Sequence, residues 1–351
     1  MYSGNTPSRL NKEHFNGAIN WISSGELKEH YIADTKEKIS DEAAKTLKML
    51  PIGTFVIAIY GLEADGVRGT GSITKSESTI SQACMAFTSK GKVQNEFLYS
   101  WYKKHGNVIG IRYAQGTKQQ NLSYDIIEKF KIAYPTFQEQ EKLNKFITLL
   151  DERIATQNKI IEDLKKLKCA IADLLFHSIS DAQTVHLGDI AHITNGVGDV
   201  QDANTEHKKD WYPFFDRSEE LKWFPTYSFD KEAIIYAGEG QSFYPRYYNG
   251  KFALHQRCYA ITDFAPCILP KYCYYFMNTL NSYFVRNSVG STVPSLRMDI
   301  FQKAEIKIPP IHKQQHICKI IDILCTKLEI EQSVISTIQK LKQFLLSQML
   351  I

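Results

Sequence analysis

The chain repeats itself at a constant offset of 174 residues, so its fold must contain one scaffold twice. Gln82-Ala83-Cys84 returns as Gln256-Arg257-Cys258, and Pro135 returns as Pro309. The register holds toward the C-terminus, where Lys168 matches Lys342. At 351 residues the chain also exceeds the roughly 250–300 residues at which single hydrophobic cores stop growing. The sequence therefore predicts two globular units related by duplication.

Each copy ends in a long segment with the pattern of a coiled coil. Residues 138–180 and 312–351 lack glycine and proline, and their apolar residues recur at spacings of three and four. Such a segment of about 40 residues makes a helix of about 60 Å. The apolar stripe of each helix, its seam, would stay exposed to water if the helix were alone. We therefore expect the two helices to pair antiparallel. The seam residues are Leu143, Ile147, Leu150, Ile154, Ile161, Leu164, Ile321, Leu324, Leu328, Ile335 and Ile338.

Polar residues interrupt both seams at matching places. Gln157 matches Glu331, and Lys168 matches Lys342. Polar residues at such positions commonly set register and partner orientation in coiled coils. An exposed or frayed seam would explain the same residues, and the sequence leaves both interpretations open.

The remaining segments combine short β-rich runs with helical patches. Thr54–Tyr60 and Ala233–Tyr236 read as strands, whereas Glu96–Tyr102 and Pro270–Met277 read as helices. The predicted fold class is α+β, with two mixed α/β domains separated by two long antiparallel coiled-coil helices and related by an internal pseudo-two-fold. The predicted segments are a first domain over 1–135, a helix over 136–180, a second domain over 181–309 and a helix over 310–351.

Composition excludes several classes of protein. No run of about 18 apolar residues exists, and the N-terminus has no signal-peptide pattern, so we expect a soluble intracellular protein. The seven cysteines form no C-x-x-C pair, which argues against a zinc site and favours small buried residues. The net charge of +4 is too small for a chain that wraps nucleic acid by global charge.

The whole pattern resembles the specificity subunits of type I restriction-modification systems. Each motif that carries the resemblance is short, and together with the duplication these motifs cover nearly the whole chain. They are Gly4-Asn5-Thr6-Pro7-Ser8, Trp21 to Leu27, Pro135 with Glu139-Gln140, Leu187-Gly188-Asp189-Ile190, and Pro309-Pro310 with Gln314-Gln315. The resemblance implies two target-recognition domains, each followed by a conserved spacer helix.

The same resemblance implies a DNA-binding subunit without catalysis of its own. Its partners would be double-stranded DNA, two methyltransferase subunits and two restriction subunits, in a bacterial or archaeal cytoplasm. S-adenosylmethionine, ATP and Mg²⁺ would lie on those partners, and this chain would hold no cofactor and no metal. The two domains would read the halves of a bipartite, asymmetric target.

One departure from the family pattern concerns the start of the first domain. The second domain opens with Val185–Ile193, a family-like entry segment, and the first domain has no counterpart because the sequence begins near Gly4. Glu26-Leu27 aligns with Glu220-Leu221 at an offset of 194, so some 15 to 20 residues are expected to be missing. The first recognition domain is therefore predicted to lack its N-terminal segment.

The chemistry of the side chains predicts which residues contact DNA. Arg, Lys, Asn and Gln read base edges, whereas hydroxyls position phosphates and aromatic rings stack. In the first domain the candidates are Thr6, Ser8, Arg9, Trp21, Ser23, Ser24, Arg68, Thr70, Lys118 and Gln119. In the second domain they are Arg217, Tyr244, Arg246, Tyr247, Lys251, Ser291 and Thr292.

Several of these loops have structural alternatives. Gly66–Gly71 lacks the Lys-Ser/Thr ending of a phosphate-binding loop, so DNA contact is favoured over nucleotide binding, with a plain solvated loop equally compatible. Phe243–Lys251 interleaves basic and aromatic residues as a groove-entering loop would, or it is a surface hairpin. Gly116–Asn121 matches Gly290–Ser295 and suits either phosphate contact or a structural turn.

Two other functions compete with DNA recognition. Asp299, Glu305 and Lys307 faintly resemble the metal-binding string of a Mg²⁺-dependent DNA endonuclease. The duplication argues against that function, because Lys131 and Ala133 take the places of Glu305 and Lys307. A coiled-coil scaffold protein would explain the helices but not the divergent Arg- and Tyr-bearing segments.

Overall fold

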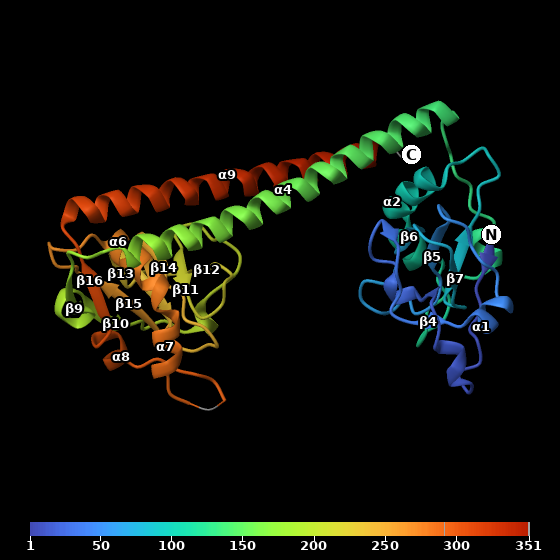
Figure 1. Ribbon diagram of the computed structural model, residues 1–351. Coiled ribbons are helices and arrows are strands. Elements are labelled where there is room, and N and C mark those ends of the chain that lie inside the picture. The colour runs from blue at the N-terminus through green and yellow to red at the C-terminus, as the bar shows by residue number, and fades with distance from the viewer. Residues whose placement is uncertain (291, 350–351) are drawn as a thin grey trace. The chain divides into compact units, whose positions relative to one another are not determined.

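We describe the chain from a computed structural model, in which residues 1–290 and 292–349 are described, with the side chain of Met349 excepted. It divides into two compact units. Unit 1 contains Met1–Asn158 and the chain from Val334 onward, and unit 2 contains Lys159–Ser333. Two long helices, α4 (Phe137–His177) and α9 (Ile311–Met349), each begin in one unit and end in the other (Figure 1).

Unit 1 is built from short strands and one long helix besides α4 and α9. Its elements are β1 (Tyr2–Ser3), β2 (Ile19–Ile22), β3 (Tyr31–Ile32), β4 (Lys38–Ile39), α1 (Asp41–Lys45), β5 (Phe55–Ala58), β6 (Gly71–Thr74), β7 (Ser78–Ile80), β8 (Cys84–Phe87), α2 (Asn95–Tyr113) and α3 (Tyr124–Ile127). They form a five-stranded sheet in the order β1-β8-β5-β6-β3 and a three-stranded sheet in the order β4-β2-β7.

Unit 2 repeats this arrangement with longer strands. Its elements are β9 (Gln183–His186), α5 (Leu187–Ile190), β10 (His192–Asn195), β11 (Tyr212–Phe215), β12 (Lys222–Phe224), β13 (Phe229–Ala237), β14 (Arg246–Leu254), β15 (Cys258–Thr262), α6 (Pro270–Met277), α7 (Asn281–Asn287), α8 (Met298–Gln302) and β16 (Glu305–Ile308). Its main sheet has the order β10-β15-β13-β14-β11-β12, and β16 pairs with β9 in a second sheet.

Several strand pairings of the two units match. The long strand β14 corresponds at the 174-residue offset to β6 and β7 together, so Ile22 pairs with Ile80 as Phe215 pairs with Leu254. Likewise Tyr2 pairs with Ala86, and Thr194 pairs with Ala260. The predicted α+β duplication is confirmed in the hydrogen-bond register as well as in the sequence.

A glycine occupies the same close approach in both copies. The N–H of Gly4 donates to the Cys84 carbonyl, and that of Gly196 donates to the Cys258 carbonyl. A Cβ on Gly4 would lie 2.3 Å from the Ile80 carbonyl oxygen, and one on Gly196 would lie 2.1 Å from the Leu254 oxygen. No side chain fits there, which explains why the repeat keeps glycine.

The long helices pack against each other in opposite directions, as predicted. In unit 2 the end of α4 meets the start of α9, where Phe176 and Ile321 share one hydrophobic core and Asp181 pairs with Lys313 at 2.6 Å. In unit 1 the first half of α4 meets the last part of α9, where Asp151 pairs with Lys342. The polar seam residue Lys342 thus has an ion-pair partner on the facing helix.

A buried glutamine joins each long helix to the unit that precedes it. The Gln314 side chain is fully buried, accepts the Leu269 N–H at 2.8 Å, and donates to the carbonyls of Cys267 and Pro309 at 2.9 and 2.8 Å. Gln140 is its equivalent in unit 1. It accepts the Gln94 N–H at 2.8 Å and donates to the carbonyls of Lys92 and Pro135, both at 2.9 Å.

Each glutamine therefore satisfies three backbone groups that would otherwise lack this partner at the start of the helix. The partners belong to the N-terminal end of α2 or α6 and to the segment before the long helix. These three bonds fix the direction in which the long helix leaves its unit. In unit 1 the helix start is further held by a capping box between Thr136 and Glu139.

We expect replacement of Gln314 by leucine to destabilise unit 2 by about 3 kcal/mol, because it removes three hydrogen bonds, one buried and two part-buried, and each unpaired backbone group costs about 1–3 kcal/mol before relaxation. Differential scanning calorimetry of the full chain would measure the loss. The neighbouring Gln315→Leu is the matched control, because Gln315 is exposed. Equal destabilisation by the two variants would contradict the role given to Gln314.

Candidate nucleic-acid interface

Unit 2 contains a polar cavity of about 530 Å³ at the end of its main sheet. Most of its lining comes from the residues after β11, the residue after Gly238 at the end of β13, and the turn between β14 and β15, and the rest comes from Val200 and from Lys222 of β12. The lining residues are Val200, Asp216, Arg217, Ser218, Lys222, Glu239, His255, Gln256, Arg257 and Cys258. We call this set the unit 2 pocket.

Two arginines flank the pocket and share one carboxylate. Arg257 lies 2.9 Å from Glu239, and Arg217 lies 4.0 Å from it. Their side chains are 65% and 74% exposed, so both guanidiniums keep donors facing solvent. Exposed guanidiniums held in place by a carboxylate suit contacts to guanine edges or phosphates.

The floor of the pocket is a buried ion pair. Asp216 lies 2.7 Å from Lys222 and accepts the Ser218 N–H and hydroxyl at 2.8 and 2.6 Å. Burial alone would raise the pKa of Asp216, but the hydrogen bonds from Lys222 and Ser218 more than offset it, and the pKa lies below its ordinary value. The carboxylate therefore stays charged and holds the loop that carries Arg217.

Arg246 contributes to the same loop from beneath. Its guanidinium donates to the Ser218 carbonyl. Residues 246–251 belong to strand β14, so the expectation of a groove-entering loop here is replaced by a strand whose side chains alternate between two faces. Tyr247 donates to Glu232 and contacts Tyr274, whereas Lys251 lies over the Tyr227 ring. Tyr244, outside the strand, is exposed.

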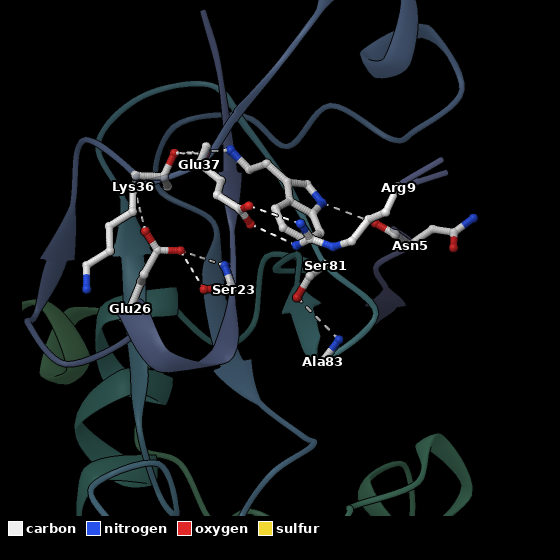
Figure 2. Close-up of polar contacts among 10 residues, drawn as sticks. Asn5, Arg9, Ser23, Glu26, Lys36, Glu37, Ser81 and Ala83 are labelled. Carbon is white, nitrogen blue, oxygen red and sulfur yellow. Dashed lines mark hydrogen bonds and ion pairs between the residues drawn. The ribbon is translucent and has the colours of Figure 1, made fainter. Parts of the chain in front are cut away.

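The matching place in unit 1 carries different chemistry (Figure 2). Ala83 stands where unit 2 has Arg257, and Ser81 stands where it has His255. The Ser23 hydroxyl and N–H donate to the Glu26 carboxylate at 2.6 and 2.9 Å, and that carboxylate also accepts the Lys36 N–H at 2.7 Å. A serine and glutamate surface therefore replaces the paired guanidiniums.

Arg9 lies beside this surface, with its guanidinium facing Glu37 in Figure 2. The two side chains form a bidentate pair at 3.0 and 2.9 Å. The Arg9 hydrogen bond holds the pKa of Glu37 below its ordinary value. Arg9 also lies 4.6 Å over the Phe15 ring, so its plane is supported on one side.

Trp21 lies under Arg9 and is only 3% exposed. Its indole N–H donates to the Asn5 carbonyl at 3.2 Å, and its ring packs edge-on against Phe15. The ring has no exposed face for stacking on a base. Thr6 donates its N–H to the Asn5 side chain, while Ser8 is exposed and Ser24 half-buried beside the same surface.

A second group of predicted residues meets around the loop after β5. Arg68 donates to the Gln120 side chain at 2.7 Å, which ties the glycine-rich loop to the Gly116 turn. The Thr70 hydroxyl caps the Val67 carbonyl at 2.6 Å. Lys118 and Gln119, at the tip of the Gly116 turn, are exposed.

The Gly116 turn shares its glycine conformation and its closing bridge with its unit 2 equivalent. Gly116 and Gly290 have φ of 102° and 104°, a region that glycine adopts readily, and each turn is closed by a bridge, Gln115 to Asn121 and Val289 to Ser295. A second bridge joins Ser295 to Glu239, so the turn with exposed Thr292 lies beside the unit 2 pocket. Ser291 lies outside the described residues.

The predicted seam residues of the two long helices are all buried or half-buried. Ile147, Ile161, Ile321 and Leu328 are buried. The half-buried ones are Leu143, Leu150, Ile154, Leu164, Leu324, Ile335 and Ile338.

The endonuclease string does not converge on one point. Asp299 pairs with Lys303 at 3.3 Å, and Glu305 and Lys307 are exposed on β16 around buried Ile306. Among the described residues, no group of three or more His, Cys, Asp or Glu is placed to hold a metal ion. The cysteines of residues 1–290 and 292–349 are all free, and Cys84 and Cys258 are buried at matching places.

Sequence reasoning missed part of the unit 2 pocket. Arg257, Gln256, His255 and Lys222 line it but were not among the candidates. The signal was present, because Gln256-Arg257-Cys258 is one of the repeated motifs, and its first-copy equivalent replaces only the arginine. Gln82 and Gln256 are exposed at the same place in both copies, and a glutamine amide suits recognition of adenine.

Comparison with known proteins identifies the family. The family described as "Type I restriction modification DNA specificity domain" matches residues 2–166 and again 179–340. Within the described residues, no helix is both long and apolar enough to cross a bilayer.

Two specificity subunits of type I restriction enzymes are similar to the chain in sequence. The specificity subunit of the EcoDI type I restriction enzyme of Escherichia coli is 30% identical over 165 residues, which are 47% of this chain and 36% of that protein. The MjaIX specificity subunit of Methanocaldococcus jannaschii is 22% identical over an alignment covering 99% of this chain and 89% of its own. The chain thus spans about a third of the EcoDI subunit and most of the MjaIX subunit.

Solved structures share the fold. The S subunit of a type I restriction-modification system from M. genitalium superposes with a TM-score of 0.61 at 16% identity, over 100% of this chain and 93% of that one. A chain from a study of complex assembly in a type I system gives a TM-score of 0.62 at 14% identity, over 94% and 90%. With both copies matched, the chain belongs to the DNA specificity subunits of type I restriction-modification systems, which are themselves non-catalytic.

Proposed function

We propose that each unit reads one half of a bipartite, asymmetric DNA target. The observation that carries the proposal is the contrast between the two copies of one surface. The same strand ends present Arg217, Glu239 and Arg257 in unit 2 but Ser23, Tyr60 and Ala83 in unit 1. Because different donors and acceptors select different base edges, one scaffold would read two unlike half-sites.

The long helices would set the gap between the half-sites. α4 has 41 residues and α9 has 39, and neither contains glycine or proline. A helix of that length spans about 60 Å, or about 17 base pairs at about 3.4 Å each. The buried amides of Gln140 and Gln314 support this role, because they hold the helix starts to the reading units.

The helices would also dock two methyltransferase subunits. Apolar side chains are exposed at matching positions of the two helices, Leu149 with Ile323 and Leu167 with Leu341. Each unit carries one residue from each helix, Leu149 and Leu341 in unit 1 and Ile323 and Leu167 in unit 2. Two equivalent apolar pairs fit two copies of one partner.

Chemistry would then come from the partners. The methyltransferase subunits would bring S-adenosylmethionine and flip an adenine out of the duplex, and two restriction subunits would bring ATP and Mg²⁺. This chain would select the DNA sequence on which the complex acts, in the cytoplasm of a bacterium or archaeon. A scaffold without recognition would not need unlike polar surfaces on matching strand ends.

We expect Arg257→Ala to weaken binding of the reconstituted methyltransferase complex to its own target and to relax specificity in only one half-site. Loss of a base contact costs about 1–3 kcal/mol, whereas loss of a phosphate contact lowers the salt slope by about one. Fluorescence anisotropy across a salt series, followed by methylation mapping of the variant, would measure both effects.

Lys303→Ala is the control for that variant, because Lys303 is an exposed cation of unit 2 paired with Asp299 on α8. Equal effects of Arg257→Ala and Lys303→Ala would contradict a reading role for the unit 2 pocket. Arg246→Ala is expected to differ from both by lowering the unfolding temperature, since Arg246 supports the Ser218 loop.

We expect Leu149→Asp and Ile323→Asp each to remove one methyltransferase subunit, and the double variant to remove both. An aspartate at either place would bury a charge against the partner without disturbing the chain, because Leu149 and Ile323 are 53% and 60% exposed. Native mass spectrometry of the reconstituted complex would count the subunits.

Leu174→Asp serves as the matched control, because Leu174 is exposed on α4 but its repeat partner, Gln348, is polar. Full stoichiometry in both single variants, or loss of a subunit from Leu174→Asp, would contradict docking at the matched apolar pairs.

A further inference from the structure

One exposed turn is built in the same way in both units. It is Ser81-Gln82-Ala83-Cys84 between β7 and β8 in unit 1, and His255-Gln256-Arg257-Cys258 between β14 and β15 in unit 2. The Cys84 N–H donates to the Ser81 carbonyl at 3.0 Å, and the Cys258 N–H donates to the His255 carbonyl at 2.9 Å. We call these two segments the glutamine turns, and the same hydrogen bond closes both of them.

The first residue of each glutamine turn also holds the turn through its side chain. The Ala83 N–H donates to the Ser81 hydroxyl oxygen at 3.3 Å (Figure 2), and the Arg257 N–H donates to His255 Nδ1 at 3.2 Å. A hydroxyl and an imidazole thus make the same contact with the backbone two residues further on. This contact fixes the backbone on both sides of the glutamine.

Further backbone hydrogen bonds tie both ends of each turn to neighbouring strand ends. Their donors and acceptors occupy matching places in the two units, and each of these bonds is 2.9 Å long. They run from Ser81 N–H to Ile22 and from Ile59 N–H to Ala83 in unit 1, and from His255 N–H to Phe215 and from Gly238 N–H to Arg257 in unit 2. The two glutamine side chains therefore start from equivalent backbone.

The fold uses neither glutamine side chain. Gln82 and Gln256 are both exposed, and within residues 1–290 and 292–349 neither side-chain amide has a hydrogen-bond partner. An exposed position of a tight turn is compatible with most residue types. The fold alone therefore does not require the same amide in both units.

The residues around the two amides belong to the unlike surfaces of the two units. Gln256 lines the unit 2 pocket beside Arg257, whose side chain is 65% exposed. In unit 1 the residue after Gln82 is Ala83, and the residue before it is buried. Glutamine is thus the one exposed residue that the two turns share, and it lies among side chains that differ.

A side-chain amide matches the edge of one base. It offers an acceptor and a donor side by side, and adenine presents an N6 donor and an N7 acceptor in the major groove. Guanine presents two acceptors there, cytosine presents a donor, and thymine presents an acceptor beside a methyl group. A bidentate contact to glutamine is therefore the property of adenine.

We propose that Gln82 and Gln256 each bind a base-paired adenine, one in each half-site of the DNA target. The amide oxygen would accept from adenine N6, and the amide nitrogen would donate to N7. This inference rests on the proposed function, because it needs one half-site on each unit. It adds that the two unlike half-sites have one base in common, read by the residue that the two turns have in common.

A protein partner present in two copies would be the other reason to repeat an exposed side chain. The exposed neighbours of Gln256 are cationic, because Arg257 and Arg217 are 65% and 74% exposed at the same pocket. Such surroundings favour a polyanion. The matched apolar residues Leu149 and Ile323 lie on the long helices instead.

The test uses the reconstituted methyltransferase complex with one leucine variant at a time. We expect Gln82→Leu to lose the preference for adenine at one position of one half-site, and Gln256→Leu to do the same in the other half-site. Long-read methylation mapping would locate both positions. Each variant should bind the wild-type target about 5- to 100-fold more weakly by fluorescence anisotropy, as expected for the loss of one bidentate base contact.

Two further changes identify the contact itself. Replacing the located adenine by 7-deazaadenine removes the N7 acceptor and keeps the base pair. This replacement should weaken binding of the wild-type complex and have no further effect on the corresponding leucine variant. Gln256→Glu offers acceptors only, so it should move the preference at that position from adenine toward cytosine. A folding defect does not create a new preference.

Gln138→Leu and Gln302→Leu are the matched controls, because both glutamines are exposed but lie outside the turns, on α4 and α8. They should change neither the methylated motif nor the affinity. All four leucine variants should keep the unfolding temperature of the wild-type chain, since each replaces an exposed side chain.

Unchanged adenine preference in both Gln82→Leu and Gln256→Leu would overturn the proposal, as would weakening that is equal for every DNA sequence. Loss of a methyltransferase subunit in native mass spectrometry would also overturn it, because the glutamines would then contact a protein. These results, obtained with a wild-type motif of two unlike half-sites, would leave the proposed function standing. A contiguous wild-type motif would instead remove the proposed function itself.

Discussion

The buried amides of Gln140 and Gln314 are the constraint on which the rest of the structure depends. Each joins three backbone groups from two segments, at the point where a long helix leaves its unit. A hydrophobic contact there would allow the helix to pivot, whereas three hydrogen bonds of fixed geometry do not. In the proposed function the helices set the distance between two half-sites, which requires a rigid joint, and the duplication supplies this joint twice.

Around these joints the molecule separates what is repeated from what is not. Several strand pairings, the Gly4 and Gly196 approaches and the φ angles of Gly116 and Gly290 are the same in both units. The side chains at the strand ends are not, because Arg257 faces solvent where unit 1 has Ala83. Scaffold geometry and recognition chemistry therefore vary independently, which lets one fold present two unlike surfaces.

The sequence predicted the parts of this structure that depend on periodicity. The two long helices were predicted because threefold and fourfold spacing is a local signal, and the strands at Phe55 and Ile234 follow from β-rich runs. The sequence predicted the candidate site less well, because tertiary packing decides the direction in which a side chain points. Trp21 is covered by Arg9 and Phe15, and Arg246 points at a carbonyl of its own unit. Arg257 belongs to a repeated motif, but only the geometry of the unit 2 pocket identifies it as a site residue.

The central claim is that two unlike readers are carried on one repeated scaffold. Long-read methylation mapping of DNA modified by the reconstituted wild-type complex tests it most directly. The account predicts two short half-sites of different sequence, separated by a gap of fixed length in which any base is accepted. A contiguous motif, or a palindrome with identical halves, would contradict it.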